Sequence, residues 1–293
     1  MKLVDLPNGL SVNALGQMDT KVLYHEMFQM QTYLKYGIQV SDGDCIFDVG
    51  ANIGLFSLSL TQSFQKLKIF AFEPIPEIFN ALKNNAKCYF TDAVLCNVGL
   101  SNVAKTSEFS YSPALTIAAS MYSSETAKSV SQEASMYDWM KAVLLDLHRI
   151  SELNVKLTQV LVKLLSIWGI RSFVFGLLSI YLSRFLLFEK KTPKQVNCEL
   201  KTVSEVMREN QICNVDLLKV DVEGSELDVL AGIDQADWHK IRQVVVEVHN
   251  VDNRVEKIAS MLEHHGYSTT VTQEDWEVVK LMNIFVVYAI QRN

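Results

Sequence analysis

The sequence predicts an α/β fold with a doubly wound, Rossmann-like sheet, a C-terminal antiparallel hairpin and a mostly helical insertion between the third and fourth strands. Three observations predict it. Short apolar runs alternate with helical patterns, and the first run leads into a glycine-containing turn. The alternation stops over residues 102–200 and then resumes. With 293 residues, of which 49% are apolar, the chain can build a large core.

Residues 1–40 are expected to form a small hairpin followed by a helix. An Asn8-Gly9 pair between apolar residues is typical of a tight hairpin turn. Apolar side chains then recur at helical spacing over residues 21–36. We therefore expect one helix to precede the first strand of the main sheet.

Strand and helix patterns alternate regularly over residues 41–101 and 201–293, which are therefore predicted to form the core of the fold. Buried parallel strands are expected at the short apolar runs 45–49, 69–73, 93–98, 215–221 and 244–248. Helical patterns follow four of these runs, at 55–64, 75–87, 225–232 and 252–265. An antiparallel hairpin is predicted to close the sheet, because no long helical pattern separates the last two runs, 267–272 and 283–290.

The insertion, residues 102–200, has a composition of its own. Residues 110–122 are mostly small and are expected to form a loop, whereas residues 151–188 are strongly apolar. The first half of the apolar segment has one helical face made of Leu153, Leu157, Val160, Leu161, Leu164, Leu165 and Trp168. The second half has another, made of Val174, Leu177, Leu178, Tyr181 and Phe185.

No transmembrane segment is expected in this insertion. Lys163, Arg171 and Arg184 interrupt it, and a membrane-spanning helix needs about 20 uninterrupted apolar residues. Three interpretations stay open: a helical subdomain packed on the sheet edge, an apolar cap over a hydrophobic substrate, and a helix lying on a membrane surface. The cap is favoured because the insertion leaves from the carboxyl end of a strand, where doubly wound folds bind their ligands.

Charge and cysteine content argue against several classes of protein. A net charge of −6 gives no basic face for nucleic-acid phosphates, so no nucleic-acid partner is expected. The five cysteines lack a C-x-x-C spacing, which argues against a zinc site or a disulfide framework and for a reducing compartment. The N-terminus lacks the apolar core of a signal peptide, so a cytoplasmic location is expected.

The strongest chemical signal is the pattern Asp48-x-Gly50-x-Asn52-x-Gly54 after the first strand. Glycines in such a turn allow a positive φ and let a ligand approach the backbone. A dinucleotide-binding turn needs G-x-G-x-x-G, and the third glycine is missing here. S-adenosylmethionine carries no phosphate and needs acceptors for its amino-acid end, which suits Asp48 and this turn better.

Two further residues stand at strand ends of the same edge. Glu73 ends the second strand, where a carboxylate accepts hydrogen bonds from the ribose hydroxyls of an adenosine cofactor. Asn97 ends the third strand, where it either contacts an adenine ring or is a solvated residue at a strand end. Two other function classes stay open: an NAD-dependent oxidoreductase on the same fold, and a membrane-surface binding protein with an empty cofactor site.

Three stretches of the sequence resemble the motifs of FkbM-family methyltransferases: Phe47–Gly54, Phe72–Pro74 and Leu218–Glu226. Residues 24–28 and 36–38 resemble the N-terminal helix of that family, and residues 244–250 resemble its late strand. The resemblance implies a class I methyltransferase sheet, S-adenosylmethionine as methyl donor and, usually, a hydroxyl oxygen as acceptor. It assigns cofactor binding to Asp48, Gly50, Ala51, Asn52, Gly54, Glu73, Asn97 and Tyr24.

The insertion narrows the class of methyl acceptor that this resemblance implies. Forms with a long apolar insertion resemble the O-methyltransferases of polyketide and nonribosomal peptide assembly lines, whose substrates arrive on a carrier protein. The predicted function is an S-adenosylmethionine-dependent O-methyltransferase acting on a hydrophobic natural-product intermediate, free or carrier-bound. A sugar or lipid hydroxyl at a membrane surface is the alternative acceptor, and the oligomeric state is left open.

Candidate catalytic residues follow the fourth and fifth strands: Asp221, Glu223 and His249. An alcohol is a weak nucleophile, and a neutral imidazole can take its proton near neutral pH. His249 is therefore expected to emerge beyond the sheet edge as the general base, oriented by Glu223. His264 and His265 lie on a late helix and are expected to be solvated.

A metal-assisted mechanism is the minority interpretation of the same edge. Asp221, Asn250 and Asp252 offer the oxygen ligands that a divalent cation prefers. His249 is a poor ligand for magnesium, so no metal is predicted.

Overall fold

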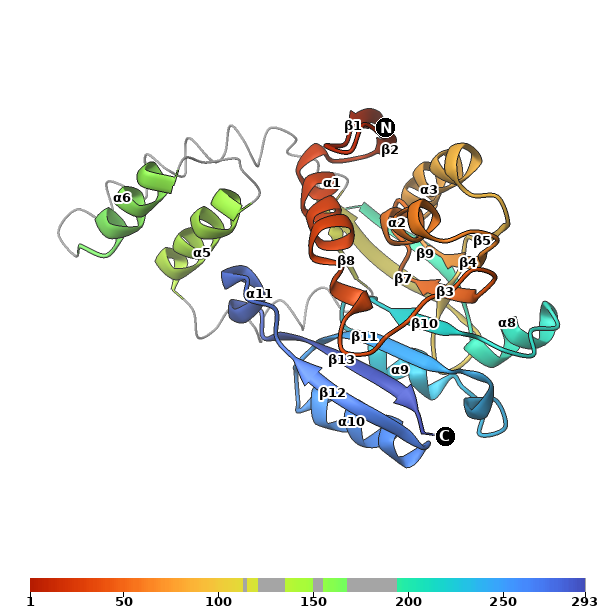
Figure 1. The fold of residues 1–293 in the computed structure, drawn as a ribbon. Coiled ribbons are helices and arrows are strands. Elements are labelled where there is room, and N and C mark those ends of the chain that lie inside the picture. Colours follow the sequence, from red (N-terminus) through yellow and green to blue (C-terminus); the bar gives the residue numbers. More distant parts are fainter. Residues whose placement is uncertain (113–114, 121–134, 150–154, 168–193, 293) are drawn as a thin grey trace.

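The structure, a computed structural model, describes residues 1–112, 115–120, 135–149, 155–167 and 194–292. Within these residues, seven strands form a central sheet in the order β12-β13-β11-β10-β3-β4-β5 (Figure 1). Its parallel strands are β3 (Cys45–Val49), β4 (Lys68–Phe72), β5 (Ala93–Cys96), β10 (Leu217–Val220) and β11 (Gln243–His249). The predicted doubly wound sheet is confirmed.

The predicted C-terminal hairpin is confirmed as well. Strand β13 (Ile284–Gln291) pairs antiparallel with β11 on one side and with β12 (Tyr267–Thr272) on the other. A short helix, α11 (Glu277–Leu281), lies between β12 and β13 in the chain. The reversed strand therefore adds two antiparallel pairings to one edge of the parallel sheet.

Helices cover both faces of the sheet, which explains why its strands are apolar on both sides. In β3, Ile46 belongs to the core on one face and Phe47 to the core on the other. The first face is covered by the N-terminal segment, α2 (Leu55–Ser63) and α3 (Pro76–Tyr89). The second face is covered by α8 (Val203–Glu209), the 3₁₀ turn Trp238–Lys240, α9 (Glu226–Ala231) and α10 (Arg254–His264).

The N-terminal segment begins with the predicted hairpin, β1 (Lys2–Asp5) paired with β2 (Ser11–Ala14). The single helix expected over residues 21–36 is wrong in its extent. Helix α1 (Gln17–Tyr24) continues into the π-helical turn His25–Met30, and the short 3₁₀ turn Thr32–Leu34 follows. Between them Gln31 has a left-handed backbone, with φ 48°. This break turns the side chain of Tyr33 into the core, where it is 2% exposed, and its burial offsets the backbone strain.

Within the described residues, the predicted insertion takes part in a second sheet with the order β6-β9-β7-β8. Its strands are β6 (Gly99–Leu100), β7 (Lys105–Ser112), β8 (Leu115–Ser120) and β9 (Lys194–Lys201). The loop expected over residues 110–122 is therefore wrong for its strand residues. Phe109 and Tyr111 alternate as buried residues along β7, a period-2 signal that the small residues around them conceal.

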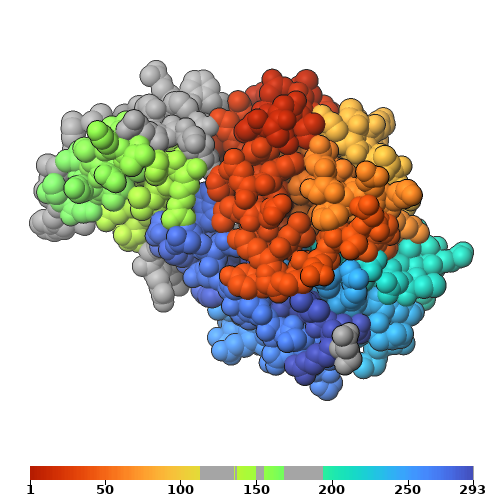
Figure 2. Space-filling model, viewed as in Figure 1, coloured from red at the N-terminus to blue at the C-terminus, as the bar shows by residue number. Residues whose placement is uncertain are grey.

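Two described helices lie between β8 and β9 in the chain: α5 (Met136–Arg149) and α6 (Val155–Leu165). Figure 1 shows α5 beside α11 and α6 farther from the central sheet, and Figure 2 shows this pair at the side of the N-terminal segment. On the predicted first face of α6, Leu165 is buried, whereas Leu157 and Val160 are 50% and 52% exposed. Leu153, Trp168 and the whole predicted second face lie outside the described residues. No helix in the described part of the chain is long and apolar enough to cross a membrane.

Candidate active site

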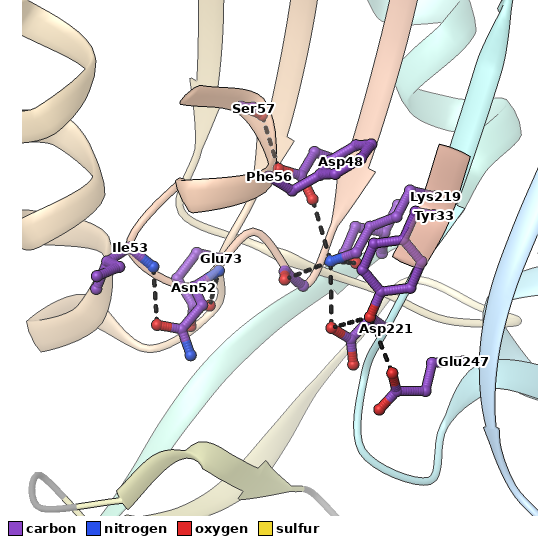
Figure 3. A network of polar contacts seen from close by, with 12 residues as sticks. Tyr33, Asp48, Asn52, Ile53, Phe56, Ser57, Glu73, Lys219, Asp221 and Glu247 are labelled. Atoms are coloured by element: carbon purple, nitrogen blue, oxygen red, sulfur yellow. Dashed lines mark hydrogen bonds and ion pairs between the residues drawn. The ribbon is translucent and has the colours of Figure 1, made fainter. Parts of the chain in front are cut away.

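The carboxyl ends of β3, β4, β10 and β11 meet at one edge of the sheet, and Figure 3 shows the polar residues that gather there from these strands, the turns after them and the N-terminal segment. The turn after β3 contains Gly50 and Gly54, with φ of 76° and 89°. A Cβ atom on Gly50 would lie 1.7 Å from the backbone oxygen of Asp221, and one on Gly54 would lie 2.7 Å from Leu82. These glycines are thus required by the chain itself, and not only by the approach of a ligand.

The backbone of this turn is anchored to the end of β4. The N–H groups of Gly50 and Ala51 donate to the carbonyl oxygen of Phe72, at 3.1 and 2.9 Å. The N–H of Asn52 donates to the carboxylate of Glu73 at 3.1 Å. The predicted cofactor residues of the first and second strands are thereby brought together.

Glu73 is 5% exposed and accepts a second backbone hydrogen bond from the N–H of Ile75, at 2.9 Å. Burial raises the pKa of Glu73 to about 7, although the two backbone donors oppose the shift. Each carboxylate oxygen has two acceptor positions, so both can still accept from ribose hydroxyls. The side-chain amide of Asn97 donates to the backbone oxygens of Glu73 and Pro74, at 2.9 and 3.0 Å, and therefore fixes the turn that holds this carboxylate.

Asp48 is buried beneath the turns of this sheet edge, whereas the sequence predicts that it contacts a cofactor. Its side chain is 0% exposed, accepts a hydrogen bond from Ser57 Oγ at 2.7 Å and lies 3.2 Å from the ammonium of Lys219. Lys219 also donates to the backbone oxygen of Gly50 at 3.0 Å and lies 3.4 Å from Asp221 (Figure 3). Sequence reasoning missed Lys219, whose signal is a lysine inside an otherwise apolar strand.

Tyr33 is a second residue that sequence reasoning missed. Its hydroxyl lies 3.1 Å from Asp221 Oδ2 and 3.0 Å from Glu247 Oε2, and its ring lies over the ammonium of Lys219 at 5.4 Å. Burial and the neighbouring carboxylates raise the pKa of Tyr33 well above its ordinary value, so the hydroxyl remains a donor. The predicted cofactor residue Tyr24 stacks instead on Phe28, with ring centroids 4.9 Å apart, and is buried in the core.

Carboxyl groups crowd this edge of the sheet. Oxygens of Asp221, Glu223 and Glu247, which we call the acidic cluster, all lie within 4.8 Å of one another. Burial, Asp221 and Glu26 raise the pKa of Glu247 well above its ordinary value. Burial, Asp221 and Glu223 raise the pKa of Glu26 to about 8. The cluster favours a cationic ligand, and Lys219 already supplies one positive charge beside it.

The three residues of the minority metal interpretation, Asp221, Asn250 and Asp252, do not come together as one group of ligands. The side-chain oxygen of Asn250 accepts from the N–H of Val255 at 3.2 Å and so caps α10. Among the described residues, the group that could hold a metal joins Asp221 to two glutamates, and Asp252 is exposed outside it.

The sequence prediction that His249 emerges beyond the sheet edge is not met. The residue is 3% exposed at the end of β11. Its Nε2 lies 3.2 Å from Glu223 Oε2, so the predicted pair does meet, and its Nδ1 lies 3.3 Å from Glu226 Oε1. Burial opposes a charge on the imidazole, but the two carboxylates outweigh it and raise the pKa of His249 well above its ordinary value. Two carboxylates beside the ring favour its protonated form, which cannot accept a proton, so this geometry does not support the predicted role of His249 as base.

The two late histidines differ from each other. His264 is exposed, in agreement with the sequence prediction. His265 is only half exposed because its ring stacks on Trp238, with ring centroids 4.2 Å apart.

Comparisons with known proteins agree with the resemblance of the motifs. A family model described as the methyltransferase FkbM domain matches residues 169–269. Over 270 residues the chain is 30% identical to 31-O-demethyl-FK506 methyltransferase FkbM of Streptomyces tacrolimicus, covering 92% of this chain and 90% of that protein. It is 28% identical over 279 residues to Methyltransferase sdnD of Sordaria araneosa, covering 91% of this chain and 89% of that protein.

A third relative is a far larger protein. The chain is 28% identical over 277 residues to AMB antimetabolite synthetase AmbE of Pseudomonas aeruginosa. The alignment covers 92% of this chain but only 12% of AmbE. The similarity therefore concerns one segment of that synthetase.

Proposed function

This chain belongs to the FkbM methyltransferase family, and we propose that it transfers the methyl group of S-adenosylmethionine to a hydroxyl oxygen of a hydrophobic natural-product intermediate. The family makes the chain a methyltransferase, and fold and family together imply the use of S-adenosylmethionine. The observation that carries the proposal is that Glu73 and the acidic cluster lie along one sheet edge, on either side of the Gly50–Gly54 turn.

The charges of this edge fit S-adenosylmethionine, which carries a sulfonium and an ammonium group. We assign the ribose hydroxyls to Glu73, whose oxygens keep acceptor positions. The acidic cluster favours the positive charges of the methionine end. The turn residues that flank this space are Gly50, Ala51, Asn52, Gly54 and Asn97, whereas Asp48 and Tyr24 support it from within the core.

The same charges argue against an NAD-dependent oxidoreductase. A dinucleotide places its pyrophosphate on free backbone N–H groups at the first turn. Here the N–H groups of Gly50 and Ala51 are used by Phe72. A pyrophosphate would also be repelled by the acidic cluster.

The acceptor is proposed to approach beside the insertion. Helix α5 is anchored to the start of α11, because Asp146 accepts hydrogen bonds from the N–H groups of Glu277 and Val278, at 3.0 and 2.8 Å. The neighbouring Trp276 contacts His25 and Met30 of the N-terminal segment. These contacts link α5 to the π-helical turn His25–Met30, which carries Glu26, and support residues 102–200 as a cap at the acceptor side.

The relatives support a natural-product hydroxyl as the acceptor. The name of the Streptomyces tacrolimicus protein says that it methylates 31-O-demethyl-FK506, and AmbE is named as a synthetase of an antimetabolite. We carry the class of acceptor over to this chain, with delivery on a carrier protein as the form that the similarity to a synthetase segment favours.

A sugar or lipid hydroxyl at a membrane surface is the second candidate acceptor. The observation that favours it is the exposure of Leu157 and Val160 on α6. Flotation with lipid vesicles distinguishes the two, because strong vesicle binding supports the membrane acceptor and its absence supports the natural-product acceptor.

The proposed function is tested by two measurements on the purified chain. Calorimetry compares S-adenosylmethionine with NAD, and binding of the first alone is expected. Intact mass spectrometry then follows hydroxylated acyl chains, each supplied free and as a carrier-protein thioester. A gain of one methyl group that appears only with a hydroxylated acceptor is the expected result, and NAD binding without S-adenosylmethionine binding would refute the proposal.

A further inference from the structure

Four charged side chains form a continuous chain of contacts from the site into the core. Glu223 Oε2 lies 3.2 Å from His249 Nε2, and His249 Nδ1 lies 3.3 Å from Glu226 Oε1. Glu226 Oε2 in turn accepts from the guanidinium of Arg254 at 3.2 Å. The two ends of the chain, Glu223 and Arg254, are 23% and 19% exposed, while His249 and Glu226 are 4% and 0% exposed. Glu223 belongs to the acidic cluster, so it is the end that a substrate at the sheet edge can reach.

This chain is balanced in charge, with two carboxylates and two cationic side chains in alternation. Alternation of this kind avoids the large cost of burying an unpaired charge. Two additional contacts hold its inner part: the N–H of Gly224 donates to Glu226 at 2.6 Å, and Arg254 donates to the backbone oxygen of His249 at 3.3 Å. Glu223 itself has a left-handed backbone, with φ 53°, which is a strained conformation for a residue with a side chain. The chain of contacts fixes that strained residue in one position.

The other carboxyl groups of the edge are less suited to accept a proton. Asp221 is engaged by Lys219 at 3.4 Å and by the hydroxyl of Tyr33 at 3.1 Å. Glu247 and Glu26 have pKa values raised by burial and like charge, which disfavours the ionised form that a base needs. Burial also raises the pKa of Glu223, but His249 opposes that shift. A base of raised pKa whose ionised form is favoured by a neighbouring cation is suited to deprotonating an alcohol near neutral pH.

We propose that Glu223 accepts the proton of the acceptor hydroxyl, and that His249, held by Glu226 and Arg254, is the residue that positions Glu223 and keeps it ionised. This inference rests on the proposed function. A lone pair of the acceptor oxygen forms the new bond to the methyl carbon while the carbon–sulfur bond breaks, and its electron pair stays on sulfur. The hydroxyl proton goes to the carboxylate of Glu223. The roles expected from the sequence are thus exchanged: the histidine orients and the carboxylate accepts.

Kinetics of two variants test the assignment. Glu223→Gln keeps the size of the side chain but cannot accept a proton, and it should lower kcat, measured at saturating S-adenosylmethionine, by roughly 10²–10⁴-fold. His249→Asn removes the cation beside Glu223, so the acidic limb of the kcat–pH profile should move to higher pH, and activity should partly recover there. The position of this limb depends on the pKa of Glu223, on which the charges of His249, Asp221 and Glu226 act. An effect on folding alone would lower kcat without moving the limb.

Matched controls lie on α10, away from the chain of contacts. Glu256→Gln and His264→Asn change exposed residues of the same types and should keep the kcat and pH profile of the unmodified protein. Thermal melting of every variant shows whether it folds. If Glu223→Gln keeps its kcat while the unmodified protein methylates a hydroxyl, the inference is wrong and the proposed function stands. If the unmodified protein binds S-adenosylmethionine and methylates no hydroxyl, both are wrong.

A measurement that needs no acceptor tests the positioning role on its own. Nitrogen-15 NMR of the histidine rings reports the protonation of each imidazole as pH is raised. His249 should remain an imidazolium beyond the ordinary range of histidine, and Glu226→Gln should lower its pKa. Titration of His249 in the ordinary range of histidine would overturn the positioning role.

Discussion

Lys219 of β10 and Asp48 of β3 form an ion pair of 3.2 Å inside the sheet, with side chains that are 2% and 0% exposed. The two residues are directly paired in the parallel register of these strands, so their side chains leave the same face. Lys219 reaches from this pair to the Gly50 carbonyl and to Asp221, and thereby ties the first turn to the acidic cluster. Two residues that belong to family motifs in the sequence thus stabilise the site from within the sheet.

Lys219→Met should destabilise the protein strongly. It leaves the buried carboxylate of Asp48 without its cation, and removing one partner of a buried pair costs about 3–5 kcal/mol. Chemical denaturation measures the loss of unfolding free energy. The double variant Lys219→Met/Asp48→Asn should recover part of it, because the unpaired charge is gone. Lys257→Met, at an exposed position of α10, is the matched control, and an equal loss in both lysine variants would contradict this account.

Glu73 should set the affinity for S-adenosylmethionine and its pH dependence. Glu73→Gln removes a charged acceptor, and a hydrogen bond to such a group contributes about 1.5–3 kcal/mol. Because burial raises the pKa of Glu73 to about 7, protonation should weaken binding as pH falls through neutrality. Calorimetry between pH 6 and 8, roughly one unit on each side of that value, should show rising affinity in the unmodified protein and a flat profile in Glu73→Gln.

Glu108→Gln, at an exposed position of β7, is the control for this measurement and should follow the unmodified protein. A binding affinity that is independent of pH in the unmodified protein would exclude Glu73 as the ionised ribose acceptor. Equal affinity of the unmodified protein and Glu73→Gln would exclude it at any pH.

The apolar elements of the fold were predictable because burial on both faces leaves a clear mark in the sequence. Strand β3 occupies the residues expected, 45–49, since every one of them is buried. Strand β7 was missed because only Phe109 and Tyr111 of its eight residues are buried, among small and charged neighbours. A strand covered on one face by so few large side chains gives a weak periodic signal.

Site residues were predictable where they lie in a turn after a buried strand. They were not predictable where tertiary contacts determine their position. Glu73 and Glu223 follow strands that the sequence marks clearly. Tyr33 reaches the cluster only because Gln31 is left-handed, a conformation that glutamine rarely adopts and that no local pattern indicates. The role of His249 depends on Glu226, which belongs to the next helix and folds back onto it. A histidine's sequence position does not reveal whether its neighbours keep it charged.

Crowding of carboxyl groups should make stability fall as pH rises. The pKa of Glu26 is raised to about 8, so between its ordinary value and pH 8 the folded protein holds a proton that the unfolded chain releases. The stability due to this group is complete below the ordinary pKa and is lost as pH rises through about 8. Glu26→Gln should therefore stabilise the protein by roughly 1–3 kcal/mol at the upper end of this range and little at the lower end. Thermal melting against pH measures it, and a gain that does not depend on pH would contradict it.

Methyl transfer should survive the removal of divalent metals. The acidic cluster has carboxylate oxygens close enough to hold a cation, but Lys219 lies 3.4 Å from Asp221 and already neutralises part of its charge. Turnover in excess chelator should equal turnover in buffer alone. Loss of activity on chelation, restored by added magnesium and not by added sodium, would instead make Asp221, Glu223 and Glu247 metal ligands.

The contact between α5 and α11 should matter for the acceptor and not for the methyl donor. Asp146 is 6% exposed and accepts from two backbone N–H groups at the start of α11, so it serves as a helix cap supplied by a distant helix. Asp146→Ala should cost about 0.5–2 kcal/mol, the usual loss for such a cap, and should loosen α5 from the start of α11. If the insertion covers the acceptor, KM for a long-chain acceptor should rise several-fold, KM for a short-chain analogue should change less, and the affinity for S-adenosylmethionine should stay the same. Asp138→Ala, at an exposed position in the first turn of the same helix, is the matched control. Equal KM values for the long acceptor in Asp146→Ala and Asp138→Ala would show that the insertion does not take part in acceptor binding. Helix α5 would then have been released from its anchor without any effect on the substrate that it is proposed to cover.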